Sequence, residues 1–259
     1  MSFHDLLVSR RAVEGGVVAT LTLHRPQRRN ALSPRLVNEL LQGIEDALGD
    51  PEVRVIVLEG GGATFCAGAD LGGGGDGGQE LAKGDFADLL AAMVRSTKPI
   101  VAKVRGYAVG GGVGLAAASH FAVAADDATF STPEVLRGLW PMMIMAVLAR
   151  TVRRRDLLEM MLLGQKFGAA KAAEVGVINR CVPEAELDAA VDALTAELAT
   201  RSPTAMARGL AAWAKMGDLT LDAALPVLRD ELYALFATDD AREGMTAFME
   251  KRAPRWTGR

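Results

Sequence analysis

The sequence predicts an α/β fold that is followed by a helical C-terminal part. Strand-like apolar segments alternate with helical segments through roughly the first 180 residues. Continuous apolar strands in such an alternation are typical of a sheet covered on both faces. From about residue 184 to 252 the pattern changes to long stretches rich in Ala and Leu, with Pro203 and Pro226 near the expected breaks between helices. We therefore expect a catalytic core over 1–195 and a helical region over 196–259.

The first elements are predicted to be a strand and a helix. Gly15 and Gly16 indicate a turn that leads into a strand over 17–23, where threonines alternate with apolar residues. Ser33 and Pro34 predict the start of a helix, because Pro is tolerated at the first helical position. Further predicted strands cover 53–60, 100–109, 121–125 and 128–132. The glycine-rich segment 71–80 is predicted to be a mobile loop.

Composition and charge exclude several classes of function. The 259 residues include 29 Lys and Arg against 32 Asp and Glu, a net charge of −3 that does not favour nucleic acid or an anionic membrane. Two cysteines and three histidines show no metal-binding, redox or catalytic-triad spacing. The N-terminus has no signal-peptide pattern. We expect a cytoplasmic protein without a metal.

The segment GYAVGGGVGLAAASHFAVA, residues 106–124, concentrates glycines in an apolar run. Residues 106–125 contain no Asp, Glu, Lys or Arg, so this stretch is long enough to span a membrane. It is nevertheless mostly Gly and Ala and lacks the large apolar residues that drive insertion, so we expect buried backbone in a soluble core. Either close packing of a helix near Val113 or close approach of a ligand would explain the glycines.

A second turn of small residues makes the ligand explanation more attractive. FCAGADL also follows a strand, and two such turns would supply two converging N–H donors, as an oxyanion hole requires. Asp70 in this turn is expected either to cap the next helix or to tighten the turn. In STPEVLRG, Glu134 would provide a carboxylate for acid–base chemistry, although a solvated loop glutamate remains the alternative.

Five stretches together resemble the enoyl-CoA hydratase/isomerase (crotonase) superfamily. They are HRPQRRNALSP, FCAGADL, GYAVGGG, STPEV with RGLWP, and FMEKRAP, in the expected order over nearly the whole chain. The resemblance implies a crotonase-like spiral of β-β-α units with a C-terminal helical oligomerisation region. It also implies a homotrimer, or a hexamer built as a dimer of trimers. The substrate would be an acyl-CoA thioester, so coenzyme A is part of the substrate and no separate cofactor is expected.

The same resemblance assigns roles to individual residues. The N–H groups of Ala69 and Gly111 would hold the thioester oxygen, and Glu134 would exchange the proton at the α-carbon. The implied substrate- and CoA-binding residues are Asn30, Ala31, Leu32, Ala67, Gly68, Asp70 and Leu71, with Phe248 and Lys251 reaching CoA in the same or a neighbouring subunit.

One departure from the family pattern bears on the reaction. Many hydratases of this family carry a second glutamate twenty residues before the one at Glu134, and this chain has Gly114 there. We place a one-glutamate enoyl-CoA hydratase ahead of a Δ3-Δ2-enoyl-CoA isomerase, and both ahead of an acyl-CoA-binding protein that has lost its activity. The segment Met142, Met143, Ile144 and Met145 replaces a glycine-rich stretch, and both a core and a pocket position remain open for it.

Overall fold

The structure, a computed structural model, describes residues 3–70 and 83–259. Its strands are β1 (Leu6–Val13), β2 (Gly16–Leu23), β3 (Val53–Gly60), β4 (Ile100–Val104), β5 (Tyr107–Val109), β6 (Phe121–Ala125), β7 (Thr129–Ser131), β8 (Lys166–Gly168) and β9 (Arg180–Val182). Within this described part, one sheet has the order β1-β2-β3-β4-β6-β9, and a smaller sheet has the order β5-β7-β8. In the larger sheet only β1 is antiparallel to its neighbour.

Helices surround the larger sheet and continue beyond it. They are α1 (Pro34–Gly49), α2 (Phe86–Val94), α3 (Gly111–Ala118), α4 (Met142–Leu148), α5 (Arg154–Leu163), α6 (Ala169–Val175), α7 (Leu187–Ala199), α8 (Pro203–Met216), α9 (Leu221–Phe236) and α10 (Asp239–Glu250). Short 3-10 turns include η1 (Pro26–Arg28), η3 (Pro133–Arg137) and η4 (Glu184–Glu186). Both α1 and α7 pack on the sheet, and the four residues Val55 to Leu58 of β3 are all buried. Since neighbouring side chains of a strand point to opposite faces, the sheet is covered on both sides.

Several predicted elements are confirmed with their local causes. The strands predicted over 17–23, 53–60 and 121–125 are β2, β3 and β6. The Ser33 side chain accepts a hydrogen bond from the N–H of Leu36, and Pro34 is the first residue of α1. This is the cap and first-turn pattern by which the helix was predicted.

The prediction of one strand over 100–109 was wrong. The chain breaks into β4 and β5, which belong to different sheets. Gly106 lies at the break with φ 65°, and a Cβ there would overlap the carbonyl oxygen of Ala63. Glycine adopts this conformation without steric cost, so the chain turns here from one sheet to the other.

Three further features differ from the sequence predictions. β1 was not predicted, because its outer position in the sheet leaves Arg10 and Arg11 exposed and weakens the apolar pattern. Pro226 lies inside α9 rather than at a break. Helix α3 begins at Gly111, two residues before the expected start. The predicted loop 71–80 lies outside the described residues.

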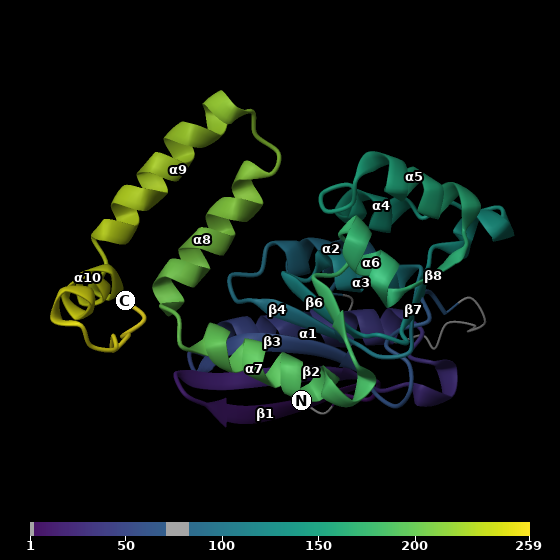
Figure 1. Cartoon of the computed structure of the whole chain (residues 1–259), viewed down its shortest axis with the longest axis horizontal. Helices are drawn as coiled ribbons and strands as arrows, with labels where there is room; N and C mark the ends of the chain where they lie inside the picture. Colours follow the sequence, from purple (N-terminus) through teal and green to yellow (C-terminus); the bar gives the residue numbers. More distant parts are fainter. Residues whose placement is uncertain (1–2, 71–82) are drawn as a thin grey trace.

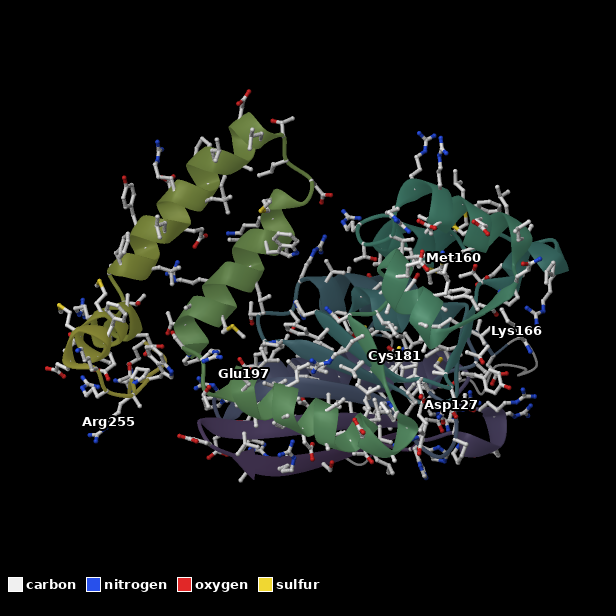
Figure 2. The ribbon with its side chains drawn as sticks, viewed as in Figure 1. Asp127, Met160, Lys166, Cys181, Glu197 and Arg255 are labelled. Carbon is white, nitrogen blue, oxygen red and sulfur yellow. The ribbon has the colours of Figure 1, made fainter. Side chains whose placement is uncertain are left out.

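The C-terminal helices form an arm that extends from the sheet (Figure 1). The boundary predicted at residue 195 falls within α7, which still packs on the sheet, and the arm begins with α8. α8 packs against α9, and α10 contacts both. Figure 2 shows side chains projecting from both sides of α9. Apolar side chains exposed on the arm are Trp213, Leu221, Leu225, Leu232, Tyr233, Phe236, Met245, Phe248 and Met249. In the part of the chain that the structure describes, no helix combines the length and apolarity needed to cross a membrane.

Asp240 fastens the C-terminal tail to the arm. Its side chain accepts hydrogen bonds from the Ser202 hydroxyl and from the backbone N–H groups of Thr257 and Gly258. Burial alone would raise the pKa of Asp240, but these hydrogen bonds outweigh burial and hold the pKa below its ordinary value of 3.8.

We expect Asp240→Ala to lower the free energy of unfolding by about 1–3 kcal/mol at pH 7, because the hydrogen bonds of Ser202, Thr257 and Gly258 to the buried Asp240 carboxylate are lost. A group with a lowered pKa stabilises the fold above its unfolded pKa, and this contribution disappears as the pH falls through the folded pKa. The difference between parent and variant in urea unfolding should therefore be full at pH 7 and shrink below about pH 4. A difference that is the same at both pH values would contradict this role of the charge.

Candidate active site

The two small-residue turns lie beside each other. Leu32 donates its N–H to the Gly68 carbonyl at 2.7 Å, and Asp70 donates its N–H to the Leu32 carbonyl at 3.1 Å. On the other side, Val109 donates to the Cys66 carbonyl at 2.9 Å. A Cβ built on Gly68 would lie 2.8 Å from the Val109 carbonyl oxygen and 3.5 Å from the nitrogen of Gly111. The backbone around Ala69 is thus held against the start of α3.

Ala69 and Gly111 each present a backbone N–H that no described residue accepts. Gly111 is the first residue of α3, where N–H groups have no acceptor within the helix. Both residues line one cavity of about 630 Å³. Two adjacent N–H donors, one of them at the positive end of a helix, can stabilise an oxygen on which negative charge develops.

Glu134 lies over the same turn. It is the second residue of η3, and a Cβ built on Gly110 would lie 2.7 Å from its Oε1 atom. Its Oε2 atom is buried, and among the described residues it has no hydrogen-bond partner. Burial raises the pKa of Glu134 above its ordinary value of 4.5, against the opposing effects of its own backbone N–H and of Arg137. A carboxylate with this position and a raised pKa can exchange a proton with a molecule in the cavity.

Apolar side chains form most of the remaining cavity wall. They are Leu32, Val37, Phe86, Leu139, Trp140, Met142, Met143 and Ile144. The sequence left open whether residues 142–145 lie in the core or in a pocket. In the structure, Met142, Met143 and Ile144 face the cavity, whereas Met145 packs against the core. Phe86, Leu139 and Trp140 were not predicted as site residues. Phe86 directly follows Asp85, whose pairing with Asp88 caps α2, and this Asp-x-x-Asp spacing ahead of an apolar run was a sequence signal for the helix.

The residues predicted to bind CoA divide into two groups. Leu32 and Asp70 line the cavity, whereas Asn30, Ala31, Ala67 and Gly68 are not among its described lining residues. The Asn30 side chain is fully buried and donates to the Gly61 and Thr64 carbonyls. Leu71 lies outside the described residues. Phe248 and Lys251 lie at the end of α10, on the opposite side of the chain from α4 (Figure 1).

Asp70 is tied to the loop before α1 by an ion pair with Arg25. Its carboxylate accepts a hydrogen bond from Nη2 of Arg25 at 2.8 Å, and Arg25 also donates to the Ala31 carbonyl at 2.5 Å. The Arg25 Nε atom lies 3.4 Å from Asp5, so one largely buried cation ties β1, the loop before α1 and the 66–70 turn together. The cap of α2 is Asp85. The ion pair with Arg25 agrees with the expectation that Asp70 tightens the turn, and the residues that follow Asp70, 71–82, lie outside the described part of the chain.

The space beside Gly114 is filled by protein. A Cβ on Gly114 would overlap Cγ2 of Ile144, lie 3.0 Å from its Cβ, and approach Phe86 at 3.6 Å. The position at which many hydratases of the family that the sequence resembles carry a glutamate is therefore closed by an isoleucine side chain.

We expect Gly114→Glu to lower the melting temperature and the activity together, because overpacking alone typically costs about 1–3 kcal/mol and the carboxylate would also be desolvated. Combining it with Ile144→Ala should recover part of the lost melting temperature, with Ile144→Ala alone as the matched control. If Gly114→Glu alone is as stable as the parent, Ile144 does not close this position.

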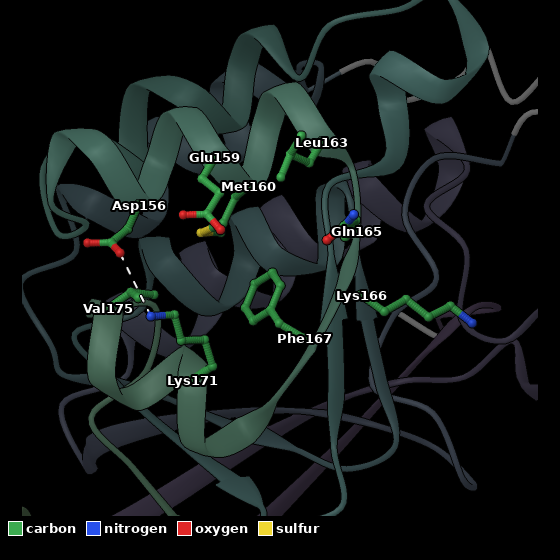
Figure 3. A pocket seen from close by; sticks show the side chains of 9 residues that line it. All are labelled: Asp156, Glu159, Met160, Leu163, Gln165, Lys166, Phe167, Lys171 and Val175. Carbon is green, nitrogen blue, oxygen red and sulfur yellow. Dashed lines mark ion pairs between the residues drawn. The ribbon is translucent and has the colours of Figure 1, made fainter.

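Other candidate groups are structural. The pKa of Cys66 is raised to about 12 by burial, so this thiol is unreactive at neutral pH. Burial also lowers the pKa of His120 to about 4, and its Nδ1 accepts the N–H of Ile100. Among the described residues, no group of three His, Cys, Asp or Glu side chains could hold a metal ion. A smaller cavity of about 100 Å³ lies between α5 and α6, where Lys171 approaches Asp156 at 3.9 Å (Figure 3). Neither Ala69 nor Gly111, whose N–H groups have no described acceptor, is among the residues that line this smaller cavity.

Comparison with known proteins places this geometry in a family context. The family model described as enoyl-CoA hydratase/isomerase matches residues 14–259. The chain is 32% identical to the probable enoyl-CoA hydratase echA8 of Mycobacterium bovis, with all of both chains covered. It is 33% identical to the 2,3-dehydroadipyl-CoA hydratase of Escherichia coli, covering 98% of this chain and 99% of that protein. A crystal structure of an enoyl-CoA hydratase from Mycobacterium smegmatis matches with a TM-score of 0.88 at 30% identity, covering 98% and 99% of the two chains.

Proposed function

Because the chain belongs to the enoyl-CoA hydratase/isomerase family, we propose that it is an acyl-CoA thioester enzyme that adds water to a 2-enoyl-CoA. The observation that carries this proposal is the buried, unpartnered Oε2 atom of Glu134 in the same cavity as the free N–H groups of Ala69 and Gly111. A proton-exchanging group and two donors for a developing oxyanion are what enolate chemistry on a thioester requires.

In the proposed reaction the thioester oxygen accepts hydrogen bonds from Ala69 and Gly111. Glu134 takes a proton from water as the water oxygen bonds to the β-carbon, and the electrons of the double bond move toward the thioester oxygen as an enolate. The same Glu134 then gives its proton to the α-carbon, and the thioester carbonyl re-forms. One carboxylate thus both removes and returns a proton, and the product is a 3-hydroxyacyl-CoA. The raised pKa of Glu134 favours its protonated form, which donates the proton to the α-carbon in the second step.

Isomerisation of a 3-enoyl-CoA to a 2-enoyl-CoA is the second candidate. It is favoured by Ile144, which closes the space beside Gly114 and leaves an apolar wall near a single unpartnered carboxylate. Here Glu134 would remove a proton from the α-carbon and return it to the γ-carbon, with no water molecule to bind.

Product analysis separates these reactions. The purified protein is incubated with 2-octenoyl-CoA and, separately, with 3-octenoyl-CoA, and products are followed by mass spectrometry and by loss or gain of the conjugated-thioester absorbance. Addition of the mass of water to 2-octenoyl-CoA supports hydration, whereas conversion of the 3-enoyl to the 2-enoyl isomer supports the second candidate. Binding without turnover would indicate an acyl-CoA-binding protein and contradict both.

We also propose that the chain forms homotrimers, alone or paired as hexamers. The arm of α8 to α10 exposes apolar side chains, including Phe248 at 85% exposed, and a second copy would cover them. Sedimentation velocity at micromolar concentration should show a trimer or hexamer, and a monomer alone at that concentration would contradict this assembly.

A further inference from the structure

The charged side chains around the large cavity are all acidic. Among its described lining residues, Asp70, Asp85 and Glu134 carry carboxylates and none is Lys, Arg or His. Asp70 is paired with Arg25, and Asp85 accepts hydrogen bonds from the first turn of α2. Glu134 keeps its unpartnered oxygen. The described lining therefore offers no basic side chain that could pair with a carboxylate at the end of a substrate's acyl chain.

Of the cations near the cavity, Arg25 pairs with Asp70, and Arg35, which follows the lining residue Pro34, also has an interaction partner and is not among the described lining residues. Arg137 influences the pKa of Glu134, but it lies exposed on η3 and is not among the described lining residues. Lys83 pairs with Glu45. In the sequence, the segment 71–82 contains no Lys, Arg or His.

The wall beyond Glu134 is apolar and continues to the surface. Leu139, Met142 and Met143 line the cavity and are 54%, 64% and 47% exposed, respectively. The long, unbranched thioether side chains can adjust to chains of different shape. A chain that reaches past the cavity would therefore remain in contact with apolar surface rather than meet charged groups.

From this lining we propose that the enzyme accepts uncharged, apolar acyl chains and discriminates against acyl chains that end in a carboxylate. The proposal rests on the proposed function, because it concerns the acyl group of the thioester bound at the same site. A terminal carboxylate held against this partly exposed apolar wall would lose part of its hydration without gaining a cation, and it would be repelled by Glu134. An apolar acyl chain of the same length would neither lose the hydration of a charged group nor be repelled by Glu134.

The test compares two substrates of equal length, 2-octenoyl-CoA and its ω-carboxylate counterpart 2-octenedioyl-CoA. We expect kcat/KM to be lower for the dicarboxylic substrate by about 10- to 10²-fold, since even partial desolvation of a carboxylate that gains no cation is costly. Equal kcat/KM values for the two substrates would overturn the proposal.

A variant pair tests the charge of the wall directly. Met142→Arg introduces a cation at an exposed lining position. We expect it to reduce the ratio of kcat/KM for 2-octenoyl-CoA to kcat/KM for 2-octenedioyl-CoA by about tenfold or more. Leu136→Arg adds the same charge at an exposed η3 residue outside the described lining and should leave the preference unchanged. An equal effect of the two variants would mean that overall charge, rather than the cavity wall, selects the substrate.

Binding separates this proposal from the proposed function. Affinities of the parent protein for octanoyl-CoA and for suberyl-CoA, its eight-carbon dicarboxylic counterpart, are measured by titration calorimetry. Tighter binding of octanoyl-CoA without turnover of either enoyl substrate would contradict the proposed function and support this inference. Turnover with equal affinities for the two saturated compounds would support the function and overturn the inference.

Discussion

Replacing Glu134 with Gln is expected to lower kcat by about 10²- to 10⁴-fold, the usual contribution of general acid–base catalysis. Gln keeps the shape of the side chain but cannot carry the proton between water and the α-carbon. The affinity for a saturated acyl-CoA should change little, because the thioester oxygen is expected to bind to Ala69 and Gly111 instead. Steady-state kinetics and titration with octanoyl-CoA measure the two effects separately. Full activity in Glu134→Gln would remove the basis for the assigned reaction.

The pH dependence gives an independent measurement on the same residue. Because burial raises the pKa of Glu134 above 4.5, kcat/KM of the parent should fall on the acidic side at a pH above that ordinary value. This limb should be absent from the residual activity of Glu134→Gln.

Stability should change in the opposite direction to activity. A carboxyl group with a raised pKa favours the folded state only while it is protonated, and it loses this contribution as the pH rises through its folded pKa. At pH values above the folded pKa, where Glu134 is ionised, it therefore costs stability, and Glu134→Gln should melt there at the same temperature as the parent or higher. A lower melting temperature would mean that the loss of activity reflects damage to the fold.

Local patterns predicted the elements whose causes are themselves local. The Ser33-Pro34 start of α1 and the continuous apolar run of β3 need only neighbouring residues for their interpretation. The break at Gly106 depends on the carbonyl of Ala63, more than forty residues earlier, so the apolar run 100–109 gave no sign of it.

The candidate site shows the same division. Two turns and the segment around Glu134 indicated a site, the family resemblance assigned Ala69, Gly111 and Glu134 to it, and the structure brings these three residues to one cavity. The contact of Ile144 with Gly114 could not be predicted, because a run of apolar residues at helical spacing does not say which of them face a cavity. Only the packing of α4 against α3 decides that Met142 faces the cavity while Met145 faces the core.

The second large effect is expected at Gly111, where two substitutions separate the N–H from the space around it. Proline has no N–H, yet it is tolerated at the first position of a helix, which Gly111 occupies in α3. Either Pro or Ala places a Cβ 2.9 Å from Cδ1 of Leu32, the flexible end of a side chain. Gly111→Ala therefore places the same Cβ as Gly111→Pro while it keeps the donor, and only the Pro ring puts a carbon, Cδ, in place of the amide hydrogen.

We expect Gly111→Pro to lower kcat by about 10²- to 10³-fold, the typical cost of losing one oxyanion donor. Gly111→Ala should retain most of the activity, because its N–H still points from the first turn of α3 into the cavity. Affinity for octanoyl-CoA should fall less than kcat in the Pro variant, since the hydrogen bond strengthens as charge develops on the thioester oxygen. Kinetics, calorimetry and melting temperatures of the two variants provide the comparison. If Ala and Pro reduce kcat equally, Gly111 is required for the packing of α3 against Leu32, and the oxyanion donor must be sought elsewhere in the cavity.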